Sequence, residues 1–271
     1  TPYWAYTSAE TLECICWVKG DTLSSKYEGN WCGAEFALGV RKDSLVLDTD
    51  TDLIKNGIVF RTDSVTLTTD RSEYIVTTGT IDAPDTLVVG RGVLLAVETI
   101  NAGRVLEFNT LVTGKTTTGT MRIIQTKETL HMTIGRLDGH VVLEGMNVTA
   151  SIGGCTDTSV VTVDGTVSLS TGCGVVLNAT EGTIVTLLQS SVVTLTSATH
   201  FSLIGKNVTA RILNARVTLK DISGVFVGTL SSAFSFDTGA GVDVIVEGDG
   251  CDVRIGSNSG SFQSLSFVAK A

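Results

Sequence analysis

The sequence predicts a nearly all-β chain built from stacked strand-and-turn coils. Three observations carry this prediction: the kind of apolar residue, the kind of turn residue and internal repetition. Val, Ile and Leu dominate the apolar residues, and Thr and Ser fill the alternate places, which suits pleated strands. No window has the apolar spacing of three and four residues that an amphipathic helix requires. A chain of 271 residues can bury a substantial core as one elongated domain or as two smaller units.

Short strand-like stretches recur between clusters of turn residues. Only two prolines occur, Pro2 and Pro84, so Gly, Asn, Asp and Ser must form the later turns. The expected strands include residues 44–47, 64–68, 86–89, 192–195, 216–219 and 242–246. The first three begin at 44, 64 and 86, about twenty residues apart, which is a plausible coil length for a solenoid.

Two internal repeats support the stack. Residues 143–152 return as residues 203–212 with seven of ten positions identical, sixty residues later. A shorter echo relates residues 159–162 to residues 191–194. Sixty residues correspond to three coils of twenty or to two units of thirty, and the sequence does not choose between them. The same local structure is expected to be built twice.

The composition changes near residue 45. Residues 1–44 contain all three tryptophans, Trp4, Trp17 and Trp31, whereas the segment from Asn109 to His200 has no aromatic residue. We expect residues 1–44 to form an aromatic, Cys-rich N-terminal cap and residues 45–271 to form the β-solenoid, because the end of a stack must be closed. The alternative is that the three tryptophans form a sugar-binding or partner-binding face.

Residues 45–268, with short Val/Thr/Leu strands, Gly/Asn/Asp turns and almost no Pro, resemble right-handed parallel β-helix proteins of the pectin-lyase-like kind. The resemblance concerns architecture only. That architecture serves polysaccharide lyases and hydrolases, phage tailspikes, adhesins and surface repeat proteins, and no motif assigns this chain to one of them. The competing architecture is an antiparallel β-sandwich or jelly roll, in which strands recur at similar spacing.

Sequons and cysteines favour an exported protein. Asn147, Asn178 and Asn207 each begin an Asn-x-Thr triplet and are the expected glycosylation sites. An even number of cysteines suits an oxidising compartment. The disulfide candidates are Cys14, Cys16, Cys32, Cys155, Cys173 and Cys251. No signal-peptide pattern starts at Thr1, so an exported protein of this sequence is expected to be a processed chain or a fragment.

The spacing of the cysteines predicts some pairings. Cys14 and Cys16 point to the same side of an extended segment, so we expect one of them to pair with Cys32. Cys155 and Cys173 are eighteen residues apart, about one coil, which stacks them on neighbouring turns. Three cysteines in each half leave an odd one in each group, which bridges the two regions or pairs between chains.

Charge limits the range of partners. The net charge of -9 and the absence of Lys and Arg between Arg136 and Lys206 argue against nucleic acid and anionic membrane. The longest apolar runs, such as residues 93–97, are about a quarter of the ~20 residues that a membrane span needs. We therefore expect self-association, or binding to other surface proteins or glycans.

No complete catalytic set is evident. His131, His140 and His200 lack a Gly-x-Ser-x-Gly elbow and are expected to be structural or solvated. Carboxylates for glycoside cleavage would come from Asp157 with Asp164, from Asp237 with Asp243, or from the acidic turn at 247–252. The catalytic set of β-helix hydrolases, adjacent aspartates with a Gly-His and a basic residue, is missing.

We expect no cofactor, and calcium is the main candidate that the sequence offers; zinc at the cysteines is an alternative for which no second close Cys pair or nearby His completes the ligand set. Asp48, Asp50 and Asp52 lie on one side of an extended segment, which suits a hard cation. The segment is not an EF-hand, because Leu53 stands where Gly is required. The function expected from the whole sequence is a non-enzymatic structural or adhesive glycoprotein of the extracellular space, the cell surface or the virion surface. The alternative is a carbohydrate-active enzyme or a glycan-binding β-helix protein.

Overall fold

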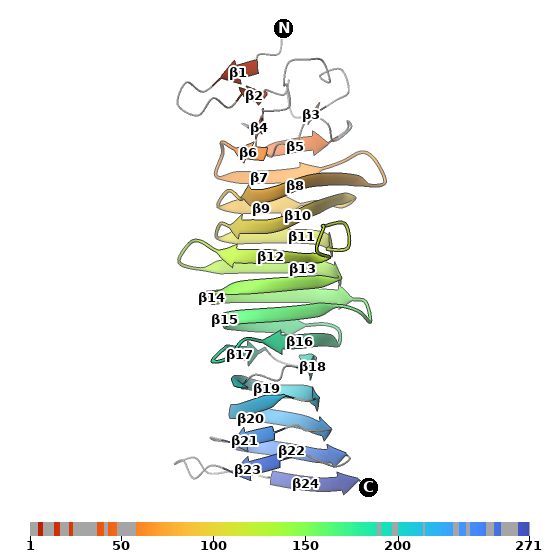
Figure 1. Cartoon of the computed structure of the whole chain (residues 1–271), viewed down its shortest axis with the longest axis vertical. Helices are drawn as coiled ribbons and strands as arrows, with labels where there is room; N and C mark the ends of the chain where they lie inside the picture. Colours follow the sequence, from red (N-terminus) through yellow and green to blue (C-terminus); the bar gives the residue numbers. More distant parts are fainter. Residues whose placement is uncertain are drawn as a thin grey trace. The chain divides into compact units, whose positions relative to one another are not determined.

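The chain is all-β throughout the part described by the computed structural model. That part comprises residues 5–7, 14–16, 22–23, 37–40, 43–47, 58–188, 191–196, 200–213, 215–229, 233–236, 239–247, 252–255 and 265–270, and it contains no helix. The chain consists of two compact units, Thr1–Gly139 and His140–Ala271. Each unit is built from parallel strands stacked one above another (Figure 1), in the manner of a right-handed parallel β-helix.

The first unit contains thirteen strands in the described residues. They are β1 (Ala5–Thr7), β2 (Cys14–Cys16), β3 (Thr22–Leu23), β4 (Ala37–Val40), β5 (Ser44–Leu47), β6 (Ile58–Phe60), β7 (Ser64–Thr68), β8 (Tyr74–Asp82), β9 (Thr86–Val89), β10 (Val93–Ala102), β11 (Val105–Val112), β12 (Thr120–Gln125) and β13 (Leu130–Asp138). Strands β3, β5, β7, β9, β11 and β13 form one parallel ladder, and β8, β10 and β12 form another. Strand β1 pairs antiparallel with β2, which continues in parallel to β4 and β6.

Columns of aliphatic side chains fill the interior of the first unit. Leu45, Leu67, Val89, Phe108 and Ile134 occupy equivalent positions on successive strands of one ladder. All five are at most 3% exposed. Their neighbours along each strand point outward and are partly exposed, so the alternation of apolar and polar residues in the sequence becomes an inside and an outside.

The second unit contains eleven strands in the described residues. They are β14 (His140–Cys155), β15 (Val160–Thr171), β16 (Val175–Ala179), β17 (Ile184–Leu187), β18 (Val192–Leu195), β19 (His200–Leu213), β20 (Arg216–Thr229), β21 (Ala233–Phe236), β22 (Gly239–Glu247), β23 (Asp252–Ile255) and β24 (Leu265–Lys270). The long strands β14, β15, β19 and β20 each turn a corner, so their two halves pair with different neighbours.

Two ladders therefore share each turn of the second unit. Ladder 1 runs through the first halves of β14 and β15, then β16, β18 and the second half of β19. Ladder 2 runs through the second halves of β14 and β15, then β17 and the first halves of β19 and β20. The chain alternates between them, with one strand segment of each ladder per turn.

The second unit has a buried aliphatic core on both ladders. In ladder 1, the side chains of Val141, Val161, Leu177, Leu195 and Ile212 stack in register and are all 0% exposed. Successive differences between these residue numbers give turns of 20, 16, 18 and 17 residues. A second column of this kind, in ladder 2, comprises Val148, Val167, Val185, Leu203 and Leu219.

The two copies of the longer repeat are sixty residues apart, which corresponds to three and a half turns. This differs from both predicted divisions, three coils of twenty residues and two units of thirty. Leu143 lies in ladder 1, whereas its counterpart Leu203 lies in ladder 2. Both copies interrupt the strand register at the same place, between Gly145 and Val148 and again between Gly205 and Val208. The repeat therefore encodes the same corner twice, on opposite sides of the solenoid.

The shorter echo marks another corner. Ser159 and Ser191 each precede a strand of ladder 1 and are 1% and 0% exposed. Ser159 Oγ accepts a hydrogen bond from the Thr156 amide at 2.9 Å, and Ser191 Oγ accepts one from the Thr171 amide at 3.2 Å. A buried hydroxyl thus satisfies a backbone amide where the ladder hydrogen bonds stop.

The all-β class and the parallel solenoid are confirmed, and the antiparallel sandwich is not the fold. The strands predicted at 44–47, 64–68, 86–89 and 192–195 have those bounds, as β5, β7, β9 and β18. Most of residues 1–44 lie outside the described residues, so the N-terminal cap and the division near residue 45 stay predictions. Among the described residues, no helix has the length and apolar character to cross a membrane.

Candidate functional surface

The outer side of ladder 2 carries a regular array of hydroxyl groups. Its seven members point away from buried neighbours and are mostly half-buried; they are Thr149, Ser151, Thr166, Ser168, Ser170, Thr186 and Ser202. We call this array the hydroxyl face. The strand register aligns its members in columns across neighbouring turns, with one column passing through Thr149, Ser168 and Thr186. Because adjacent strands lie about 4.8 Å apart, the array is a regular lattice.

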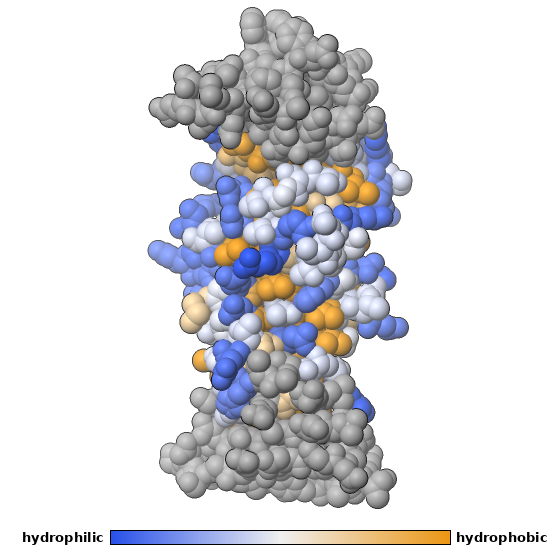
Figure 2. Space-filling view, viewed as in Figure 1, coloured by the Kyte–Doolittle hydropathy of each residue, from blue (hydrophilic) through white to orange (hydrophobic). Residues whose placement is uncertain are grey.

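The hydroxyl face lies in a stretch of ladder 2 whose described outward positions include one ionisable side chain, the exposed His200. Between Asn147 and Ile204, the outward positions of ladder 2 include no Lys, Arg, Asp or Glu in the described residues. Three aliphatic side chains complete the surface: Ile184 and Leu188, which are 37% and 38% exposed, and the half-buried Ile204. On the side shown in Figure 2, side chains of high, intermediate and low hydropathy are interspersed across the described part.

The seven hydroxyls keep their hydrogen-bonding capacity for an outside partner. Within the described part of the chain, none of their side chains forms a hydrogen bond with another group. A hydroxyl both donates and accepts, so each can bind a partner of either kind. The face is therefore an open polar surface that needs no charged partner.

The outer side of ladder 1 differs, because three of its hydroxyls, those of Thr162, Thr180 and Thr196, form hydrogen bonds within the protein. Thr162 Oγ1 lies 2.7 Å from His140 Nε2, and Thr180 Oγ1 donates to Asp164 Oδ1 at 2.9 Å. The Thr196 hydroxyl donates to the side-chain oxygen Oδ1 of Asn178 one turn away. Burial lowers the pKa of His140 below its usual value. In ladder 1 these polar groups thus form hydrogen bonds that join its own turns.

Charged groups bind one another along the first unit. Arg104 pairs with Asp85 at 3.0 Å, and Asn101 donates to Asp82 at 2.7 Å, in each case between successive turns. Glu98 accepts hydrogen bonds from the Thr118 hydroxyl at 2.7 Å and from the Thr117 amide, which lowers the pKa of Glu98.

The hydroxyl face of ladder 2 was not predicted from the sequence, because Ser and Thr occupy outward positions on both ladders.

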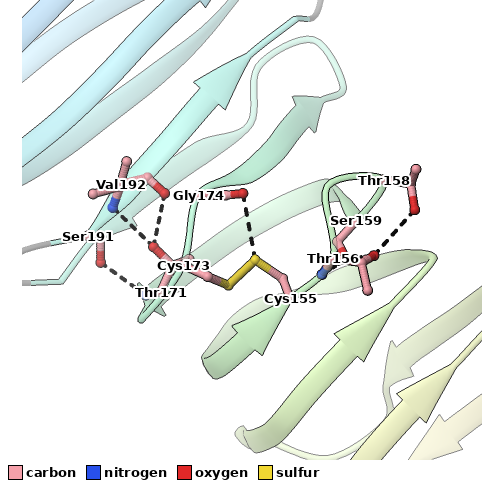
Figure 3. The surroundings of a disulfide bond; sticks show 9 residues. All are labelled: Cys155, Thr156, Thr158, Ser159, Thr171, Cys173, Gly174, Ser191 and Val192. Carbon is pink, nitrogen blue, oxygen red and sulfur yellow. Dashed lines mark hydrogen bonds between the residues drawn. A yellow bond between two sulfur atoms is a disulfide. The ribbon is translucent and has the colours of Figure 1, made fainter.

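The predicted stacking of Cys155 and Cys173 is confirmed. Cys155 ends β14, Cys173 follows β15 one turn later, and a disulfide joins them with their Cα atoms 6.0 Å apart (Figure 3). Thr171 lies nearby and exchanges hydrogen bonds of 3.1 Å with the backbone of Val192 on the next turn. This corner is therefore tied across three turns.

One pair of carboxylates lies together, and the sequence did not single it out. Glu144 and Asp164 occupy paired positions on adjacent strands of ladder 1, next to the paired Gly145 and Gly165. The predicted pair of Asp157 and Asp164 is not brought together. Asp157 precedes β15, and Asp164 is four residues beyond Val160, or about 13 Å along the strand. A glycosidase pair is at most ~9.5 Å apart. A turn length of twenty residues, counted back from Asp164, would have identified Glu144.

The remaining candidates are dispersed or undescribed. His131 lies exposed on β13 of the first unit, and His200 bonds Thr218 at 2.7 Å on β20. No group of three His, Cys, Asp or Glu side chains in the described residues has the arrangement of a metal site. Asp243, Glu247 and Asp252 lie in β22 and β23, and Cys14 and Cys16 lie in β2, without described side chains. Outside the described residues are Trp4, Trp17, Trp31, Cys32, Asp48, Asp50, Asp52, Asp237, Asp249 and Cys251.

The three sequons occupy different environments. Asn147 is exposed beside the irregular corner of β14, and its neighbour Met146 is 73% exposed. Asn178 is half-buried in the middle of β16, and Asn207 lies in β19. Their glycosylation stays a prediction.

Comparison of the chain with protein-family models, with curated proteins and with solved structures finds no match. The surface chemistry of the fold itself is therefore the basis for the proposed function.

Proposed function

We propose that this chain is a non-enzymatic structural or adhesive protein of an extracellular, cell or virion surface, which assembles through its β-solenoid. The hydroxyl face is the observation that carries the proposal. A regular lattice of small, uncharged hydroxyl side chains repeated over several turns suits contact with another extended surface. Small side chains with few rotamers lose little conformational entropy on contact, and uncharged ones cost little to desolvate.

The disulfide supports the proposed location at an extracellular, cell or virion surface. Disulfides persist in oxidising compartments and are rare in the cytosol, and the Cys155–Cys173 bond closes one turn of the solenoid. The sequons at Asn147, Asn178 and Asn207 agree with the same location.

Sedimentation velocity of the native protein over a wide concentration range tests the assembly. We expect reversible association, without the addition of a cofactor. A protein that stays monomeric at every concentration and binds no surface protein or glycan would contradict the proposal.

A carbohydrate-active function is the second candidate, and the pairing of Glu144 with Asp164 favours it. Paired positions on adjacent strands have backbones about 4.8 Å apart, which allows the two carboxyl groups to reach the ~5–5.5 Å separation of retaining glycosidases. The test is hydrolysis or lysis of neutral and acidic polysaccharides by the wild type, Glu144→Gln and Asp164→Asn. Activity that either substitution abolishes would establish this function in place of the structural one.

A further inference from the structure

We infer that Thr162 is an activated hydroxyl that accepts an acyl group from an ester, with His140 as its general base. A covalent modification site on ladder 1 goes beyond the proposed function and is independent of assembly through the hydroxyl face. Three features of the outer side of ladder 1 point to it: a contact between a hydroxyl and a base, an amide beside that contact, and a second pair of His and Thr without the amide.

Thr162 and His140 lie within hydrogen-bonding distance on adjacent strands. His140 begins β14, and its Nε2 atom lies 2.7 Å from the Thr162 hydroxyl on β15. With the imidazole proton on Nδ1, the Nε2 atom accepts the hydroxyl proton. A separation of about 2.6–3.2 Å between a hydroxyl and a base is the arrangement that activates serine and threonine as nucleophiles. Both side chains are partly exposed, so a small ester can reach them.

Burial keeps the His140 side chain in the form that accepts a proton. Partial burial of the imidazole lowers the pKa of His140 below its ordinary value of 6.5. The ring is therefore uncharged at neutral pH, and its Nε2 lone pair is available to the Thr162 hydroxyl. A protonated ring would donate to the hydroxyl instead and would not activate it.

The amide of Asn178 lies beside the Thr162 hydroxyl on the following turn. The two residues are paired in register on β15 and β16, and the backbones of such strands are about 4.8 Å apart. The Thr196 hydroxyl donates to Asn178 Oδ1, so the oxygen end of the amide faces the next turn. The Nδ2 end forms no hydrogen bond with a residue in the described part of the chain. An amide in this place can stabilise the oxyanion that forms when a hydroxyl attacks an ester.

The reaction transfers the acyl group from one oxygen to another. Thr162 Oγ1 attacks the carbonyl carbon of the ester while Nε2 of His140 takes the hydroxyl proton. The bond between the carbonyl carbon and the leaving alcohol then breaks, and His140 gives the proton to that alcohol. One ester is consumed and another forms on Thr162, so the step needs no oxidant or reductant. Glu144 and Asp164 lie in the next row of the same side and favour an uncharged ester over an anionic one.

A second pair of His and Thr in the same unit lacks the amide. His200 Nε2 lies 2.7 Å from the Thr218 hydroxyl. His140 and His200 occupy the same place in the sequence, three residues before each copy of the longer repeat. The residue paired with Thr218 on the following strand is Ser235, where the first pair has Asn178. Serine is shorter than asparagine and reaches less far between turns, so we expect the first pair to react faster.

Reaction with p-nitrophenyl acetate, an uncharged ester, tests the inference on the full chain. Release of p-nitrophenolate measures the rate, and mass spectrometry of peptides locates the acetyl group. Cleavage before Asp157 and Asp164 releases residues 157–163, which contain Thr162. Fragmentation of this peptide separates acetylation of Thr162 from acetylation of its other hydroxyl residues.

Three variants separate an activated hydroxyl from a structural contact. We expect His140→Asn to slow the acetylation of Thr162 by at least about a hundredfold, and Asn178→Ser to slow it by at least about tenfold. His200→Asn is the matched control, because it removes the base of the second pair and should leave the acetylation of Thr162 unchanged. In the wild type, Thr218 should carry less acetyl than Thr162. Circular dichroism checks folding, and Asn178→Ser provides the test if His140→Asn does not fold.

Acetylation of Thr162 at the same rate in the wild type, His140→Asn and Asn178→Ser would show that the contact is only structural and would overturn the inference. A wild type that carries no acetyl at Thr162 would overturn it as well, and either result leaves the assembly proposal unaffected. Release of p-nitrophenolate beyond one equivalent per chain that Thr162→Val abolishes would show turnover. That result would confirm the activated hydroxyl, and the non-enzymatic function proposed above would fail.

Discussion

Cys155 and Cys173 lie on successive turns of the second unit, with their Cα atoms 6.0 Å apart, and a disulfide joins them. They lie at the corner that follows the ladder 2 segment of each turn. The bond encloses the turn at residues 156–159, in which Thr156 Oγ1 and Ser159 Oγ lie 2.9 Å apart. The disulfide therefore closes one complete coil of the solenoid.

Removal of this disulfide should lower the free energy of unfolding by about 3 kcal/mol, because the crosslink closes a loop of eighteen residues in the unfolded chain. The variant is Cys155→Ser with Cys173→Ser, and urea unfolding measures the loss. Peptide mapping without reductant should recover the two cysteines in one linked fragment. A double variant as stable as the oxidised wild type would contradict the structural role of the bond.

The fold was predictable from the sequence because its strands are short and are separated by turn residues. The bounds of β5, β7, β9 and β18 follow from short runs of Val, Leu, Thr and Ser that begin directly after Asp or Ser. The half-turn offset of the repeat was not predictable. Turn length varies from 16 to 20 residues between Val141 and Ile212, so sixty residues do not correspond to a whole number of turns.

The hydroxyl face could also not be predicted from the sequence. Thr162 and Ser168 both alternate with buried aliphatic residues along β15, and nothing local distinguishes them. Thr162 bonds His140, twenty-two residues away, whereas the Ser168 hydroxyl has no partner in the described part of the chain. Only the register between turns decides which hydroxyls are used internally.

Gly165 is expected to tolerate no side chain. Its φ of +120° is rare for other residues, and a Cβ atom there would overlap the carbonyl oxygen of Gly145 on the previous turn. Gly165→Ala should therefore destabilise the protein by about 1–3 kcal/mol. Gly174→Ala is the control, since a Cβ there meets nothing within 4 Å. Equal unfolding midpoints for the two variants would show that the corner adjusts freely.

His140 should make stability depend on pH. Burial lowers the pKa of His140 in the folded state below its ordinary value of 6.5. The unfolded chain then binds a proton in a pH range where the folded chain does not, so stability falls as pH decreases through 6.5 towards the folded pKa. His140→Asn removes the titrating imidazole. The free energy of unfolding, measured with urea, should then change less between pH 5 and 7.5. His131→Asn makes the same substitution at an exposed position and is the matched control.

The sequons at Asn147 and Asn178 are expected to differ in glycan occupancy when the chain is produced through a secretory pathway. Asn147 is exposed beside an irregular corner, where an attached sugar can extend into solvent without disturbing a ladder. Asn178 lies half-buried within β16, its side-chain oxygen accepts a hydrogen bond from Thr196, and the Thr180 hydroxyl of the same sequon donates to Asp164.

A glycan on Asn178 would have to displace these contacts between turns, so we expect occupancy at Asn147 and little at Asn178. Mass spectrometry of peptides before and after enzymatic deglycosylation measures both sites in one sample. Asn147→Gln should remove most of the glycan mass carried by these two sites, and Asn178→Gln should remove almost none. The reverse pattern would mean that the accessibility of the folded corner does not determine which sequon is modified.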